Sequence, residues 1–258
     1  MKPTNIAPIT LPNDLVSGLK DKDPDRYRAS LFAPKDMRAR LHVLYGFHAE
    51  LAKIPEIVSE PMIGAIRYQW WREAIAEIYE GKPVRKHEIA TPLAAVLLEA
   101  DVPRFWVDRL IDGRERDIDP EPFRSADETK DYAARTSGVL MQIAARLLDD
   151  DFDAERALKA GEAWGLTGIL RGWGYYTDGM LSEVSFEDIA NAAQASYAAA
   201  RGSAFKTEII PAVAYGALVP KFLNRLTHSR HDPTVNVVHY APLLKQFRMM
   251  RAAMTGKI

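Results

Sequence analysis

The sequence predicts an all-α protein that forms a single domain over residues 1–258. Apolar residues recur at intervals of three and four along most of the chain, which is the pattern of one buried face of an α-helix. No segment alternates apolar and polar residues over the length of a strand, and the nearest candidate, 235–238, is short. The connections expected near 81–87, 117–125, 149–153 and 228–240 lack the length and composition of a linker between domains.

The first strong helix is expected over about 35–54, where Leu41, Leu44, His48 and Leu51 share one face. Pro55 is expected to stop or kink this helix, because proline has no N–H to donate. A second helix follows Pro61 and is expected to end at Gly81, since glycine readily takes the left-handed conformation that closes helices. The same periodicity predicts further helices near 88–100, 104–116, 126–148, 154–178, 186–205 and 208–227.

The last expected helix is amphipathic and basic. Its apolar residues are Leu243, Leu244, Phe247, Met250 and Met254, and its cations are Lys245, Arg248, Arg251 and Lys257. Such a helix can lie on an anionic membrane surface. Alternatively, it can pack on the bundle and expose a solvated basic face. The sequence leaves both interpretations open.

The composition excludes several classes of function. The net charge of −1 gives no global basic field, so we expect no nucleic-acid partner. The absence of cysteine excludes disulfides and thiolate sites. No run of about 18 apolar residues indicates a membrane span, and the N-terminus shows no leader pattern. We therefore expect a cytoplasmic protein, with peripheral contact to the inner membrane through the last helix as an alternative.

Four segments in order resemble the squalene/phytoene synthase family, the head-to-head prenyl transferases. The first contains Tyr27, Leu31, Phe32, Pro34, Arg38, Leu44, Tyr45 and Phe47. The others are 110–117, the stretch from Tyr132 to Val139, and Leu166, Thr167, Ile169, Leu170 and Arg171. This resemblance implies an isoprenoid-synthase-like helical bundle around a central cavity.

The family's metal-binding carboxylates are largely absent from the matching positions. The family holds Mg²⁺ on two acidic motifs, and Mg²⁺ requires oxygen ligands of this kind. The first motif aligns with Ala52 and Glu56, and the second aligns with Gly172, Tyr175 and Tyr176. We therefore expect no catalytic residue, no metal site and no cofactor; Mg²⁺ would be needed only by an active enzyme.

A narrower resemblance concerns a non-catalytic branch of this family, which includes a mitochondrial assembly factor for respiratory complex I. The segments that carry it are 47–54, 58–64 and Arg67-Tyr68-Gln69-Trp70-Trp71. It implies a protein that acts by binding, with a partner in respiratory complex assembly. Two alternatives remain open: an active prenyl diphosphate transferase that uses Glu50 and Glu56, and a carrier of an isoprenoid or lipid ligand.

The candidate cavity or ligand-binding residues are Tyr45, His48, Glu56, Arg67, Gln69, Tyr132, Arg135 and Arg171. The arginines suit phosphate or carboxylate groups, because a guanidinium offers several donors in a fixed plane. Their alternative role is in ion pairs along helix faces. His48 lies on an apolar helix face, so it is either a base in the cavity or a core histidine with satisfied hydrogen bonds.

Overall fold

The computed structural model describes residues 13–176, 179–228, 231–235 and 238–258. These residues form helices and loops without a strand, which confirms the all-α prediction. The helices are α1 (Asn13–Lys22), α2 (Pro24–Ser30), α3 (Lys35–Ile57), α4 (Pro61–Tyr79), α5 (Ala90–Glu99), α6 (Arg104–Glu115), α7 (Ala126–Ala133), α8 (Val139–Leu148), α9 (Ala154–Arg171), α10 (Trp173–Tyr176), α11 (Phe186–Ala200), α12 (Ile210–Val213), α13 (Val219–Leu226) and α14 (Pro242–Thr255).

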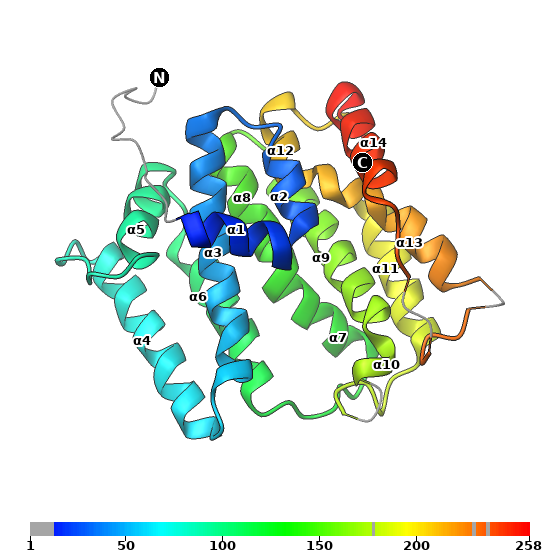
Figure 1. The fold of residues 1–258 in the computed structure, drawn as a ribbon, viewed down its shortest axis with the longest axis horizontal. Coiled ribbons are helices and arrows are strands. Elements are labelled where there is room, and N and C mark those ends of the chain that lie inside the picture. Colours follow the sequence, from blue (N-terminus) through cyan, green and yellow to red (C-terminus); the bar gives the residue numbers. More distant parts are fainter. Residues whose placement is uncertain (1–12, 177–178, 229–230, 236–237) are drawn as a thin grey trace.

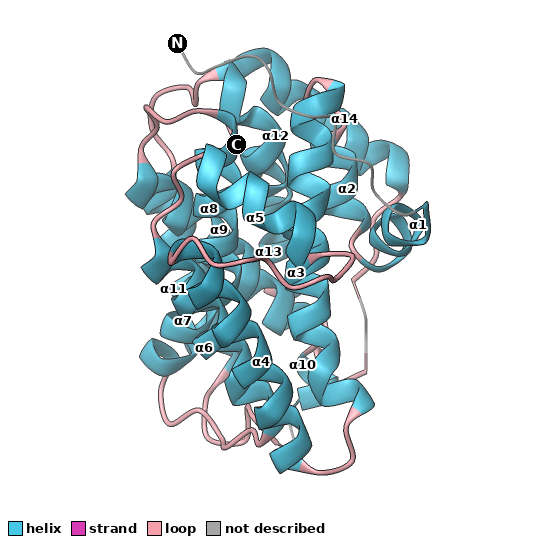
Figure 2. Ribbon diagram, turned by 90° about the vertical axis from the view of Figure 1, so that its left-hand side faces the viewer, coloured by secondary structure: helices cyan, strands magenta, loops and turns pink. Residues whose placement is uncertain are grey.

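Helices α3, α8 and α9 form the centre of the bundle, with α4, α5 and α6 on one side and α11, α13 and α14 on the other (Figure 1). Helix α9 packs against α7, α8, α11 and α13, and its inward face is buried. Figure 2 shows the same helices stacked around this centre from a second direction. Within the described residues, no helix is both long and apolar enough to cross a bilayer.

Pro55 neither stops nor shortens α3, which continues to Ile57. A proline inside a helix leaves the carbonyl four residues earlier without its donor, which here is the carbonyl of Leu51. The Tyr68 hydroxyl of α4 donates to this Leu51 oxygen at 2.8 Å and lies 2.9 Å from the Arg114 oxygen of α6. Tyr68 is fully buried, so this contact satisfies the freed carbonyl where water has no access.

Three of the long helices predicted by periodicity are interrupted in the structure. The helix predicted over 154–178 ends at Arg171, and α10 restarts after Gly172; 177–178 lie outside the described residues. The segment 208–227 divides into short turns because Pro211 and Pro220 each begin a new one. The segment 126–148 contains a π-helical turn, Ala134–Gly138. The strand-like segment 235–238 includes 236–237, which also lie outside the described residues.

The π-helical turn lies where α9 approaches most closely. A Cβ added to Gly161 of α9 would lie 2.4 Å from the Ser137 carbonyl oxygen and 2.8 Å from the Gly138 Cα. Both atoms belong to the backbone of the turn, so they cannot move aside as a side chain can. Gly161 therefore sets the distance between two walls of the central cavity.

Candidate functional site

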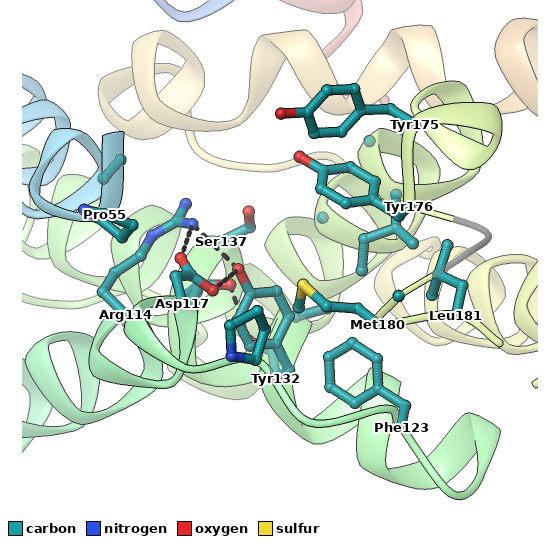
Figure 3. Close-up of a pocket in the computed structure, with 18 of the residues that line it drawn as sticks. Pro55, Arg114, Asp117, Phe123, Tyr132, Ser137, Tyr175, Tyr176, Met180 and Leu181 are labelled. Carbon is teal, nitrogen blue, oxygen red and sulfur yellow. Dashed lines mark hydrogen bonds and ion pairs between the residues drawn. The ribbon is translucent and has the colours of Figure 1, made fainter. Parts of the chain in front are cut away.

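A cavity of about 810 Å³ opens between α3, the end of α6, α7, α9 and α10. Ala52, Pro55 and Glu56 line it from α3, and Gly165, Gly168 and Ile169 line it from α9. Tyr175 and Tyr176 of α10 lie across the cavity from Arg114 and Asp117 (Figure 3). This cavity is the central one that the family resemblance implied.

A hydrogen-bond network forms one wall of the cavity. Arg114 Nη1 lies 3.0 Å from Asp117 Oδ2 and 3.1 Å from the Tyr132 hydroxyl, to which it donates. The Tyr132 hydroxyl in turn donates to Asp117 Oδ1 at 2.8 Å (Figure 3). Arg114 Nη2 contacts His48 Nε2 at 2.8 Å. Helices α3, α6 and α7 are thus connected through one guanidinium group.

The network fixes the protonation state of His48. Burial lowers the pKa of His48 well below its usual value, and the positive charges of Arg114 and Arg26 lower it further. An arginine only donates hydrogen bonds, so the neutral His48 ring accepts at Nε2 and carries its proton on Nδ1. His48 is therefore a buried histidine whose contact with Arg114 lies behind the cavity surface; it is not among the lining residues.

A second buried histidine, His42 of α3, behaves in the same way. Burial, assisted by Arg38, lowers its pKa to about 4, and its Nε2 lies 2.8 Å from the Ser30 hydroxyl. Below pH 6.5 the unfolded chain takes up protons that the folded protein does not. The stabilising contribution of each neutral histidine is therefore complete above pH 6.5 and is lost as the pH falls toward the folded-state pKa.

We expect the free energy of unfolding to fall by up to about 1.4 kcal/mol per pH unit for each of these histidines below pH 6.5. Urea unfolding at about pH 5 and about pH 7.5 measures this slope. The His42→Asn variant should show a shallower slope than the unsubstituted protein. Equal slopes for the two proteins would contradict the assignment of His42 as a buried neutral group.

The cavity offers few carboxylates to a metal ion. Glu56 and Asp117 are the two acids among the lining residues, and Asp117 is bound to Arg114 and Tyr132. A Cβ on Gly172 would lie 3.0 Å from the Tyr176 ring, so this ring covers the position. Over the described part of the chain, no group of three His, Asp or Glu side chains could hold a metal ion. This donor set is smaller than the two acidic motifs on which the family holds Mg²⁺.

The structure brings together some of the residues singled out from the sequence. Glu56 and Tyr132 line the cavity, and His48 supports it through Arg114. Tyr45 is buried on α3, and its hydroxyl has no hydrogen-bond partner among the described residues. Its pKa is raised well above the usual value, mainly by burial. Tyr45 is not among the lining residues.

Other candidates lie away from the cavity. Arg67 and Gln69 are exposed on α4, and Gln69 donates to Glu73 at 3.1 Å. Arg135 is exposed and forms a 2.7 Å ion pair with Asp131 one helical turn earlier. Arg171 lies over the Phe222 ring, with its guanidinium carbon 4.3 Å from the ring centre. For Arg135, the structure matches the alternative of an ion pair along a helix face.

Three charged residues of the cavity were not among the candidates: Arg26, Arg114 and Asp117. Arg26 is buried on α2, pairs with Asp23 and donates to the Tyr215 hydroxyl at 3.3 Å. The signal for Arg114 and Asp117 was present, because both lie in the segment 110–117 that resembles the family. The signal for Arg26 was weaker, since it adjoins Tyr27 but is not itself a landmark.

Comparisons with known proteins show the family of the chain. A family model described as squalene/phytoene synthase matches residues 19–180, more than half of the chain. The chain is 30% identical over 161 residues to a mouse protein named NADH dehydrogenase (ubiquinone) complex I, assembly factor 6, covering 62% of this chain and 48% of that protein. It is 28% identical to a 15-cis-phytoene synthase from Paracoccus over 55% of this chain and 49% of that enzyme. The chain thus spans about half the length of the curated relatives it matches.

Solved structures confirm the fold class. A dehydrosqualene synthase in complex with ligand superposes with a TM-score of 0.72 at 17% identity, over 93% of this chain and 95% of that chain. A squalene synthase from Alicyclobacillus acidocaldarius superposes with a TM-score of 0.60 at 13% identity, over 95% and 97%. The fold is therefore the all-α isoprenoid synthase fold.

Proposed function

The chain belongs to the squalene/phytoene synthase family, and from this premise we propose that it is a non-catalytic member that acts by binding in the assembly of respiratory complex I. One observation carries the non-catalytic part of the proposal. The cavity persists, but Ala52, Tyr175 and Tyr176 line it where the family places carboxylates. Ionisation of an allylic diphosphate develops negative charge on the leaving oxygens, and these side chains cannot hold the Mg²⁺ that would balance it.

The assembly role is supported by the relatives named complex I assembly factor 6. The mouse, bovine and human proteins named complex I assembly factor 6 are 29–30% identical to this chain over 160 or 161 residues. The identity with the phytoene synthase is 28% over a smaller share of the chain.

We expect no pyrophosphate release when the purified protein is incubated with farnesyl or geranylgeranyl diphosphate and Mg²⁺. The matched control is a Glu56→Gln variant, because an active enzyme with a rebuilt site would depend on this cavity carboxylate. Release of pyrophosphate together with a C30 or C40 product, abolished in Glu56→Gln, would overturn the non-catalytic proposal and establish a prenyl transferase.

The assembly role needs a separate test in cells. Deletion of the gene from its source organism is expected to lower the NADH:ubiquinone oxidoreductase activity of isolated membranes. Complementation by the unsubstituted protein and by the Glu56→Gln variant should restore this activity equally, since the role requires no chemistry at the cavity. Unchanged activity in the deletion strain would overturn the assembly role and leave the family membership untouched.

The open cavity favours a second, compatible function as a carrier of an isoprenoid or lipid ligand. Its volume of about 810 Å³ lies within the usual range for small-molecule sites, and apolar residues such as Phe123, Ile169 and Met180 contribute to its lining. Native mass spectrometry of protein isolated from cells tests this role directly. A stoichiometric apolar ligand would support it, and protein free of bound ligand would contradict it.

A further inference from the structure

The C-terminal helix α14 exposes the side that is usually buried in an amphipathic helix. Leu243, Phe247, Met250 and Met254 follow one another at helical spacing, and Leu243 and Met254 are 80% and 81% exposed. Phe247 is 60% exposed. The side of α14 that packs on the bundle instead carries the buried Met249 and Ala252. At about 100° per residue, the exposed apolar row lies on the opposite side of the helix from these two residues.

The helix is held in this orientation by contacts at its packed side. Lys245 Nζ lies 2.8 Å from Asp25 Oδ2 of α2, and both side chains are almost buried. At the other end, the Phe205 N–H donates to the Gly256 oxygen at 2.7 Å. Gly256 has a positive φ of 66° and closes the helix. The exposed row therefore cannot turn inward without breaking a buried ion pair.

Basic residues lie on α14, just after it, and at the ends of α11 and α13. We call the five residues Arg201, Arg225, Arg248, Arg251 and Lys257 the basic belt. Within the described ranges, none of the five has an ion pair with an acid, whereas other surface cations such as Arg72 and Arg85 do. After Glu208 the sequence contains one acidic residue, Asp232, against seven Lys or Arg residues. This face is positive although the chain as a whole has a charge of −1.

Two tyrosines show that Arg201, Arg225, Arg248 and Arg251 are close together in space, and the guanidinium carbons of Arg201 and Arg225 lie 6.0 Å and 5.9 Å from the centres of the Tyr197 and Tyr240 rings. Burial raises the pKa of Tyr197 on α11, while Arg201, Arg248 and Arg251 all act against this shift. Burial likewise raises the pKa of Tyr240, and Arg225 and Arg248 oppose it. Arg248 is common to both groups, so these four arginines form a continuous group from α13 across α14 to the end of α11.

We propose that α14 and the basic belt form a docking surface for an anionic lipid bilayer, in which the exposed row of α14 enters the headgroup region and the belt contacts lipid phosphates. This inference does not depend on the proposed role in complex I assembly. A 14-residue helix is roughly 21 Å long and cannot cross a hydrocarbon core of about 30 Å, so it lies in the plane of the interface. The choice of occupant rests on charge: lipid phosphates supply the anions that the belt lacks.

Vesicle co-sedimentation tests this surface with the full chain. The protein is expected to bind vesicles of phosphatidylcholine with about 30% phosphatidylglycerol and to stay in solution with phosphatidylcholine alone. The Arg248→Gln/Arg251→Gln variant should bind about thirty-fold more weakly, since each cation near an anionic surface contributes about a factor of five. The Phe247→Ser/Met250→Ser variant should bind at least about tenfold more weakly.

The matched control is Met62→Ser/Ile66→Ser, which removes two exposed apolar side chains from α4. Helix α4 lies on the other side of the molecule from α14 in both ribbon views (Figures 1 and 2), so vesicle binding should be unchanged. Circular dichroism and thermal unfolding confirm that each variant is folded. Failure of the unsubstituted protein to bind anionic vesicles, or equal binding by the Phe247→Ser/Met250→Ser variant, overturns the proposal.

Discussion

Replacement of Gly161 by alanine is expected to lower the free energy of unfolding by about 3 kcal/mol and the melting temperature by roughly 10 °C. The new methyl group would lie 2.4 Å from the Ser137 carbonyl oxygen and 2.8 Å from the Gly138 Cα. Both are backbone atoms of the π-helical turn, so α9 must move away from the turn to relieve the overlap. Differential scanning calorimetry of the variant and the unsubstituted protein measures the loss.

Gly168→Ala on the same helix is the matched control. A Cβ at Gly168 would meet no atom within 4 Å, because this position faces the open cavity. Alanine in a helix is more stable than glycine by roughly 0.5–1 kcal/mol, so this variant should be as stable as the original or slightly more stable. If both variants lost the same stability, the loss at Gly161 would not come from close helix packing.

Replacement of Arg114 by methionine is expected to lower the free energy of unfolding by about 3 kcal/mol. The side chain of Arg114 is 17% exposed and binds Asp117, Tyr132 and His48. Without it, the Asp117 carboxylate keeps Tyr132 as its donor but loses the balancing positive charge, and His48 Nε2 loses its partner. A largely buried charge left without its counter-charge is costly, because water cannot replace the lost partner. Chemical denaturation measures the change.

The titration of His48 distinguishes this network from a loss of packing alone. Arg114 contributes to the lowered pKa of His48, so the pKa of His48 should rise in Arg114→Met. In Arg114→Lys the positive charge remains and the pKa should rise less, although the planar contacts to Asp117 and Tyr132 are lost. NMR titration of the His48 ring protons reports these values. The same His48 pKa in all three proteins would contradict the proposed electrostatic contact.

The helices could be predicted from the sequence because their signal is local, whereas their interruptions could not. Gly81 follows the end of α4 as expected and has a φ of 70°. This left-handed conformation could be predicted because it depends on the glycine alone. Pro55, in contrast, was expected to disturb α3. Whether it does so depends on Tyr68, a residue of the next helix whose hydroxyl reaches the freed carbonyl. Likewise, the π-helical turn lies at the close approach of Gly161 from α9, a tertiary contact that no local pattern signals.

The candidate site was predicted in part, for the same reason. Glu56 was found because the family resemblance aligns it with a cavity position, and it does line the cavity. The approach of His48 to Arg114, 66 residues later in the chain, is a tertiary contact without a sequence pattern. The guanidinium chemistry that made Arg67 and Arg135 candidates is the same for an exposed arginine and for a buried one. Only the fold separates Arg114 and Arg26 from them.

The side chains of Tyr175 and Tyr176 on α10 give the opening of the cavity an uncharged surface near neutral pH. Phenols carry no charge near neutral pH, and burial moves the pKa of Tyr176 still higher. Carboxylates at these positions would make ligand binding in the cavity depend on divalent cations. Tyr175 and Tyr176 instead offer polar hydroxyls beside flat apolar rings. A ligand of the kind proposed above would therefore be selected at this opening by its shape and by desolvation, and its binding should not respond to chelators or to magnesium.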